Sequence, residues 1–148
     1  MTTVKFKSVI FTGSVNTSAS SWGVGGLVGW NTGIINGILN SYSTGSVSGN
    51  GEGYIGGLVG YNDGNITNTY SIGTVDGIGD EVGGLVGSGD NSKTVNSYWD
   101  MTELGKGASL GGGIGKNTSE MKSKDTFIDW DFDTIWNIDD GVSYPYLR

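Results

Sequence analysis

The sequence predicts an all-β fold, a parallel β-helix-like solenoid of about four to five coils with an aromatic C-terminal cap. The first observation is the pentapeptide Gly-Gly-Leu-Val-Gly, which begins at residues 25, 56 and 83, and a degraded copy, Gly-Gly-Gly-Ile-Gly, begins at residue 111. These starts lie 31, 27 and 28 residues apart, and self-similarity at a period of about 20–50 residues is typical of solenoids and arrays. The second observation is that aligned positions repeat the same residue types, as in-register stacking requires.

Tyrosines mark a second point in the repeat. Tyr42, Tyr70 and Tyr98 lie 28 residues apart, each two residues after an asparagine, and Ile10 takes this position in the first unit. The expected columns of stacked side chains are Val24, Ile55, Val82 and Leu110; Leu27, Leu58 and Leu85; Val28, Val59, Val86 and Ile114; Ile38, Ile66 and Thr94; and Asn40, Asn68 and Asn96. We expect the leucine column to be buried, and the asparagines to form hydrogen bonds along the stack and satisfy turn backbone.

Strands are favoured over helices throughout the repeats. The chain has 29 glycines, and each costs roughly 0.5–1 kcal/mol inside a helix. Short alternating runs such as Ile38-x-Asn40-x-Tyr42 indicate strands, and we expect two or three per coil. The double glycine before Leu-Val indicates close backbone approach to a bulky neighbour, such as the tyrosine column, or a simple corner.

The two ends differ from the repeats. Residues 4–10 alternate apolar and basic side chains, which predicts a first strand with lysines on one face. Residues 117–126 are expected to hold one short helix that opens at Thr118 or Ser119. The last segment is rich in aromatic residues and is expected to cover the last coil. We therefore divide a single domain into repeats at 1–124 and a capping segment at 125–148.

The repeat phrases resemble a known family. Residues 24–33, VGGLVGWNTG, and residues 55–64, IGGLVGYNDG, resemble the GLUG motif, named for Gly-Leu-hydrophobic-Gly, which recurs in bacterial surface adhesins and in metallopeptidases that cleave immunoglobulin A. The closing aromatic phrase is also similar to the ends of such arrays. The resemblance implies an extracellular β-solenoid module at a bacterial cell surface, with no catalytic residue in the motif itself, which acts as a spacer or a binding surface.

Composition and net charge restrict the classes of binding partner that we expect. The chain has 148 residues, no cysteine, and a net charge of −7, which argues against binding to nucleic acid or to an anionic membrane. It has no apolar run long enough to insert into a membrane as a helix. The N-terminus lacks the apolar core of a signal peptide, and we interpret the chain as a fragment of a secreted protein with Met1 added for expression.

Catalysis is not expected. Histidine is absent, which removes the commonest general base and the usual zinc ligand. A glycosidase needs only two carboxylates, so a polysaccharide-cleaving β-helix enzyme stays an alternative, although the acidic residues scatter over turns. Another alternative is a structural subunit that self-associates by stacking end to end.

Two groups of residues are candidate binding sites. Strand alternation at Asp129, Asp131 and Asp133 would place three carboxylates on one face, where they could hold calcium or form the exposed side of a capping strand. Trp30 and Tyr61 both follow the pentapeptide and could line a surface that binds a glycan, or simply pack. Ser88 and Lys116 break their column. Glycans and host surface proteins are the expected partners, with no cofactor other than calcium.

Overall fold

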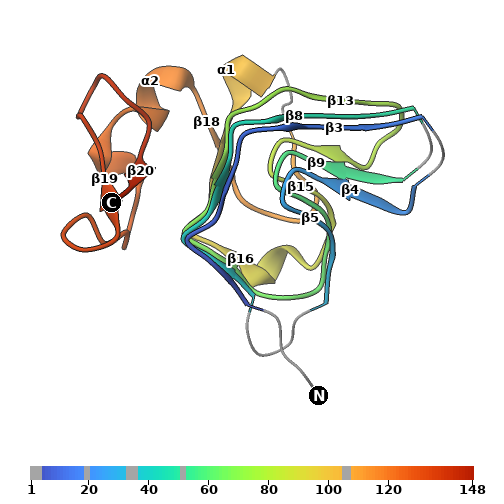
Figure 1. Ribbon diagram of the computed structural model, residues 1–148, viewed down its shortest axis with the longest axis horizontal. Coiled ribbons are helices and arrows are strands. Elements are labelled where there is room, and N and C mark those ends of the chain that lie inside the picture. Colours follow the sequence, from blue (N-terminus) through green and yellow to red (C-terminus); the bar gives the residue numbers. More distant parts are fainter. Residues whose placement is uncertain (1–4, 19–20, 33–36, 51–52, 105–107) are drawn as a thin grey trace.

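The structure, a computed structural model, is a β-solenoid with a C-terminal segment beside it (Figure 1). It describes residues 5–18, 21–32, 37–50, 53–104 and 108–148. In Figure 1 the coils superimpose when viewed end-on, and the last residues form a separate orange-red layer along one side. The predicted all-β solenoid class is confirmed.

Each complete coil consists of five short strands. The first coil contains β1 (Phe6–Lys7), β2 (Ile10–Phe11), β3 (Ser14–Thr17), β4 (Gly23–Gly25) and β5 (Val28–Asn31). The second contains β6 (Ile38–Leu39), β7 (Tyr42–Ser43), β8 (Ser46–Gly49), β9 (Tyr54–Gly56) and β10 (Val59–Asn62). The third contains β11 (Ile66–Thr67), β12 (Tyr70–Ser71), β13 (Val75–Gly77), β14 (Val82–Gly83) and β15 (Val86–Gly89). An incomplete fourth contains η1 (Asn91–Lys93), β16 (Thr94–Val95), β17 (Tyr98–Asp100) and α1 (Met101–Leu104).

The strands of successive coils pair in parallel and in the predicted register. Ile10, Tyr42, Tyr70 and Tyr98 align in one sheet, and Val24, Ile55 and Val82 align in another. Backbone hydrogen bonds link the leucine column, from Leu27 N to Leu58 O and from Leu58 N to Leu85 O, each 2.9 Å. Leu58 and Leu85 are fully buried, whereas Leu27, in the first described coil, is only partly buried.

The described residues form three complete coils and part of a fourth, fewer than the four to five predicted. The degraded copy at 111–115 is not a fourth pentapeptide rung: β18 (Ile114–Lys116) pairs with β17, so Ile114 lies beside Tyr98 and not above Val86. Leu110, which was expected in the column of Val24, Ile55 and Val82, is 51% exposed. The change of path follows from Gly112 and Gly113, whose φ angles of 98° and 96° are accessible to glycine and turn the chain away from the strand direction.

A left-handed corner in each coil adds one strand break to those that divide the coil into five strands, where two or three were predicted. Asn40, Asn68 and Asn96 have φ angles of 46°, 53° and 47°, and Ser8 has 58° at the equivalent place. This left-handed conformation suits asparagine better than most residues. It ends one strand and starts the next, and at Ser8 it divides the predicted first strand; Val4 of that strand lies outside the described residues.

The double glycines do mark a close approach, but not to tyrosine. A Cβ on Gly57 would overlap Ser71 Oγ and the carbonyl oxygen of Gly84, and a Cβ on Gly84 would overlap the Trp99 ring. Ser71 and Trp99 each follow a tyrosine of the column. Since neighbours on a strand point to opposite faces, these residues face the interior and the tyrosines face outward.

The tyrosines instead meet the C-terminal segment. That segment contains α2 (Thr118–Met121), η2 (Lys124–Thr126) and the antiparallel pair β19 (Trp136–Asn137) and β20 (Tyr146–Leu147). The helix starts at Thr118 as predicted, with Asn117 as its N-cap. One buried cluster joins segment and stack: Tyr42, Tyr70, Tyr98, Met121, Phe127, Trp130 and Trp136.

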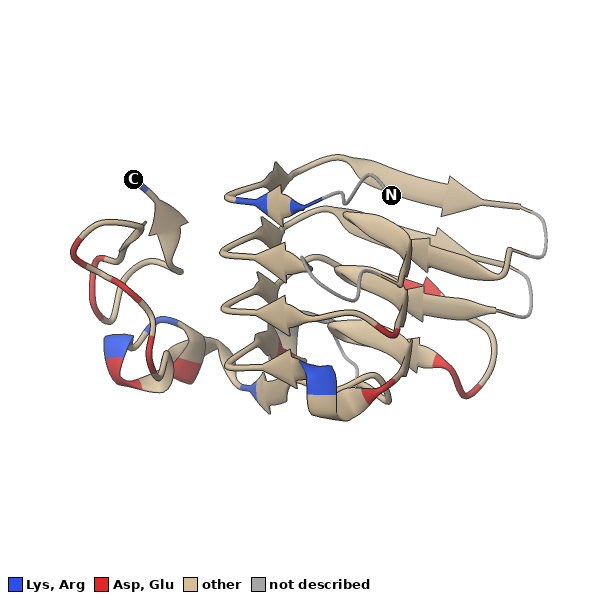
Figure 2. Cartoon of the chain, turned by 90° about the horizontal axis from the view of Figure 1, so that it is seen from below, with Lys and Arg blue, Asp and Glu red and all other residues tan. Residues whose placement is uncertain are grey.

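The sequence predicted that the aromatic segment covers the last coil. The structure instead places it along the side of the solenoid, against the tyrosine column. Trp136 lies 5.9 Å from Tyr42 and 6.1 Å from Tyr70, ring centre to ring centre, so it touches two successive coils. Figure 2 shows the segment standing beside the stacked rungs. Residues 108 and 109 lie over the pentapeptide of the third coil: Gly84 N donates to Ala108 O over 3.0 Å, and Ser109 Oγ bonds to both Val86 N and Val86 O over 2.8 Å.

Candidate ligand-binding wall

Three aromatic rings gather on the outer wall of the first two coils. Trp30 on β5, Tyr54 on β9 and Tyr61 on β10 come from neighbouring strands. The Trp30 and Tyr61 rings stack at 4.3 Å and 27°, because the two residues are paired in register. Tyr54 lies 5.7 Å from Trp30 and 4.9 Å from Tyr61. We call these three residues the aromatic wall.

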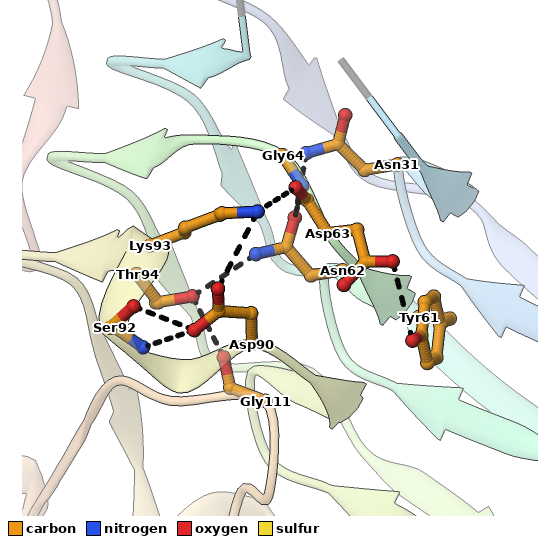
Figure 3. Close-up of polar contacts among 10 residues, drawn as sticks. All are labelled: Asn31, Tyr61, Asn62, Asp63, Gly64, Asp90, Ser92, Lys93, Thr94 and Gly111. Carbon is orange, nitrogen blue, oxygen red and sulfur yellow. Dashed lines mark hydrogen bonds and ion pairs between the residues drawn. The ribbon is translucent and has the colours of Figure 1, made fainter. Parts of the chain in front are cut away.

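The residues that follow Trp30 and Tyr61 in the sequence form a buried, hydrogen-bonded asparagine ladder (Figure 3). Asn31 and Asn62 follow Trp30 and Tyr61, and their inward side chains leave the rings facing outward. Asn31 Nδ2 donates to Asn62 Oδ1 over 2.7 Å, and Asn62 Oδ1 also accepts from Gly64 N over 3.3 Å. Figure 3 shows the next two hydrogen bonds of the ladder. Asn62 Nδ2 donates to Thr94 Oγ1, and Thr94 Oγ1 donates to Gly111 O.

The ladder was missed by the sequence analysis, which assigned this role to Asn40, Asn68 and Asn96. Those asparagines form the left-handed corners, and their backbone amides continue the sheet: Asn40 N donates to Thr67 O and Asn68 N to Val95 O. The signal for the true ladder was the shared phrase aromatic-Asn at 30–31 and 61–62.

The ring stack has two rungs. Ser88 is paired with Tyr61 and ends the aromatic column, as predicted. Lys116 does not lie in this column, because it is paired with Asp100 in a different sheet. Trp30 is therefore the first ring of the stack, and 46% of its surface is exposed. Its stacked side is supported by Tyr61, which fixes the plane of the indole.

Acidic groups border the wall. The Tyr61 hydroxyl donates to Asp63 Oδ2 over 3.4 Å, and the Asp63 charge raises the pKa of Tyr61. Asp90 accepts from Ser92 Oγ and Ser92 N, and these hydrogen bonds lower its pKa, so it is ionised at neutral pH. Lys93 pairs with Asp90 at 3.4 Å and also donates to Asp63 O. The aromatic rings are thus bordered by two carboxylates, of which Asp90 is paired with Lys93.

The predicted calcium residues form a turn and not a strand. Asp131 accepts from Asp133 N over 2.9 Å and from Thr134 N over 2.8 Å, and its other oxygen accepts from Thr134 Oγ1. Asp129 has a φ of 60° and accepts from Asn96 Nδ2. The expected alternation onto one face is wrong for this segment. Among the residues that the structure describes, no three acidic side chains converge as metal ligands.

Comparison with known proteins identifies the repeat. The family model of the GLUG motif matches residues 51–76, which confirms the resemblance seen in the sequence. The matched residues run from just before β9 to β13 and include Tyr54 and Tyr61 of the aromatic wall. No curated protein and no solved structure matches the chain. Within the described ranges, no helix has the length and apolar character needed to cross a membrane.

Proposed function

We propose that this GLUG-motif repeat protein is a non-catalytic, extracellular module of a bacterial surface protein of the adhesin type, and that its aromatic wall binds a glycan. The observation that carries the proposal is the half-exposed Trp30 indole, held in a fixed plane by Tyr61 and Tyr54. An exposed aromatic group that is already ordered loses little conformational freedom when a ligand packs on it.

A sugar fits this chemistry better than a flat apolar ligand does. The C–H face of a pyranose packs against an aromatic ring through many small dispersion contacts, and its hydroxyls can bond to the carboxylates and hydroxyls around the ring. The rim contains Asp63 and the pair Glu81 and Ser88, in which Ser88 Oγ donates to Glu81 over 3.4 Å. Because this rim is negative, the wall should prefer neutral sugars over sialylated or uronic ones.

The motif and the composition support the remaining parts of the proposal. The GLUG motif occurs in surface adhesins, which supports an extracellular role. The absence of histidine and cysteine from the sequence supports a non-catalytic role. If the wall binds nothing, the same fold would serve as a spacer between other parts of a surface protein.

A glycan array probed with the labelled chain, followed by titration calorimetry on the best neutral hit, tests the proposal. We expect Trp30→Ala to weaken binding at least about tenfold, equivalent to about 1.4 kcal/mol. Ile78→Ala is the matched control, since Ile78 is an exposed apolar residue outside the wall. Equal binding by both variants, or binding to acidic glycans only, would contradict the assignment.

The same glycans test for catalysis. We expect none of them to be shortened during long incubation with the chain, as followed by chromatography of the products. Turnover that is lost when one carboxylate is replaced would favour the polysaccharide-cleaving alternative.

A further inference from the structure

The aromatic columns of the wall change to polar residues in the third coil. Tyr61 is stacked on Trp30, and on its other side it is paired with Ser88, a small and half-buried residue. Tyr54 is followed in its own column by Glu81, because the residues after these two are paired in register. Ser88 Oγ donates to Glu81 Oε1 over 3.4 Å. On the side that faces the third coil, the two tyrosines therefore meet a hydroxyl and a carboxylate and not a further ring.

A second carboxylate lies at the hydroxyl end of Tyr61. Asp63 is exposed, and its Oδ2 accepts from the Tyr61 hydroxyl over 3.4 Å. Figure 3 shows the Asp63 carboxylate turned toward Tyr61, while Lys93 reaches the backbone carbonyl of Asp63 and pairs with Asp90. The charge of Asp63 raises the pKa of Tyr61, and the charge of Asp90 adds to this effect. The ring of Tyr61 thus lies in a negative electrostatic potential.

Both kinds of group on the wall favour a cation. In the described part of the chain, neither Asp63 nor Glu81 has a basic side chain within ion-pair distance. A positively charged ligand gives such carboxylates charge-assisted hydrogen bonds, which are about twice as strong as those between neutral groups. The faces of aromatic rings carry partial negative charge and attract a cation within about 6 Å of the ring centre. A neutral sugar would use the rings but leave both carboxylates without a counter-charge.

We propose that the aromatic wall recognises an amino sugar with a protonated amine, whose ring packs on the aromatic side chains and whose ammonium group pairs with Asp63 and Glu81. The inference rests on the glycan function proposed above and adds the charge of the sugar. A small alkylammonium ion would supply the charge but cover less of the rings, whereas a hexosamine supplies an apolar C–H face and a cation together. Acetylation of the amine removes the charge and keeps the sugar ring, so it separates the two contributions.

Three β-1,4-linked trimers test the proposal: those of glucosamine, N-acetylglucosamine and glucose. They differ only at C2, which carries an ammonium, an acetamide or a hydroxyl group. We expect calorimetric titration of the native chain to give a Kd for the glucosamine trimer at least about tenfold lower than for either neutral trimer. The difference should shrink as salt is added, because exposed charges are screened. Trp30→Ala should weaken the binding of all three trimers, since packing on the rings is common to them.

The double variant Asp63→Asn/Glu81→Gln removes both charges and keeps the size of the side chains. We expect its Kd values for the three trimers to lie within about twofold of one another. Unchanged binding of the neutral trimers shows that the variant is folded. The matched control Asp76→Asn/Asp133→Asn changes the net charge equally at two exposed residues. Asp76 lies in the sheet of β3, β8 and β13, which contains none of the rings, and Asp133 lies in the C-terminal segment. This control should keep the preference for glucosamine.

Three results would overturn the inference. Equal affinity of the native chain for the three trimers does so and leaves the glycan proposal standing. A preference for glucosamine that both double variants lose equally does so as well, because the attraction would then come from the net charge of the chain. Failure of all three trimers to bind also overturns it, while the glycan array with Trp30→Ala decides separately whether the wall binds another glycan.

Discussion

At Gly57 the backbone leaves no space for a side chain. Its Cβ would overlap Ser71 Oγ and the carbonyl oxygen of Gly84, both in the next coil. The backbone carbonyl cannot move without breaking the register of the coil. We expect Gly57→Ala to lower the free energy of unfolding by about 1–3 kcal/mol, the usual cost of overpacking, as measured by urea denaturation.

Gly13→Ala is the control for this substitution. A Cβ at Gly13 would lie 3.3 Å from two carbons of the Phe11 ring, which is partly exposed in the first coil and can shift. Its effect on the urea midpoint should be small. If both variants lose stability equally, the loss comes from replacing the backbone freedom of glycine and not from the close approach between coils.

Asp131 couples the C-terminal segment to pH. Hydrogen bonds from Thr134 lower its pKa, so the folded state favours the ionised form. The stability gained is present above the unfolded pKa of about 3.9 and is lost as pH falls through the lower folded value. We expect Asp131→Asn, which keeps the turn acceptor without the charge, to lose less stability than the native chain on acidification below about pH 4. Thermal melts over a pH series measure this.

Calcium provides a separate test of the same turn. The Asp131 carboxylate already accepts from Asp133 and Thr134, and Asp129 accepts from Asn96. We expect added calcium to leave the melting temperature of the native chain unchanged. A calcium-dependent rise in the melting temperature that is lost in Asp131→Asn would show that these aspartates bind the metal.

Among the elements, the C-terminal segment depends most on Trp136. This residue is fully buried, lies 4.4 Å from Trp130, and contacts tyrosines of two coils. We expect Trp136→Ala to cost about 3–5 kcal/mol, out of a total stability of about 5–15 kcal/mol for a domain, and so to lower the melting temperature sharply in a calorimetric scan. Trp22→Ala, at a tryptophan that is 80% exposed, is the control. An unchanged melting temperature for Trp136→Ala would make the segment an independent tail.

The elements show what repetition can and cannot predict. Columns such as Leu27, Leu58 and Leu85 were predictable, because in-register stacking brings equivalent residues together whatever the path of each coil. The sequence pattern does not state which side of a column faces inward. The tyrosines face outward here because the residue after each one packs on a double glycine, and this orientation moves the aromatic segment from the end of the stack to its side.

The candidate site was predictable in part for the same reason. Trp30 and Tyr61 were found as an aligned aromatic pair, and their stacking follows from register. Tyr54 lies beside them but comes from a different sheet. The spacing of a sequence repeat does not predict how far apart two sheets lie around a corner of the coil. Asp129, Asp131 and Asp133 failed for a similar reason: alternation predicts a strand, but the hydrogen bonds that Asp131 accepts from Asp133 and Thr134 stabilise a turn.

For the whole molecule, stacking implies that stability depends on the number of neighbours a coil has. The leucine column offers a matched pair of amides: Leu27 N and Leu58 N each donate to the leucine of the next coil over 2.9 Å. The hydrogen bonds are equal in length, but Leu58 belongs to a coil with described neighbours on both sides, whereas Leu27 belongs to the first described coil. We expect the Leu27 amide to exchange at least about tenfold faster than that of Leu58, a difference of about 1.4 kcal/mol in opening free energy. Hydrogen exchange followed by NMR measures both. Equal rates would mean that the first coil opens only when the whole solenoid unfolds, so that the coils act as one cooperative unit and not as a chain of neighbours.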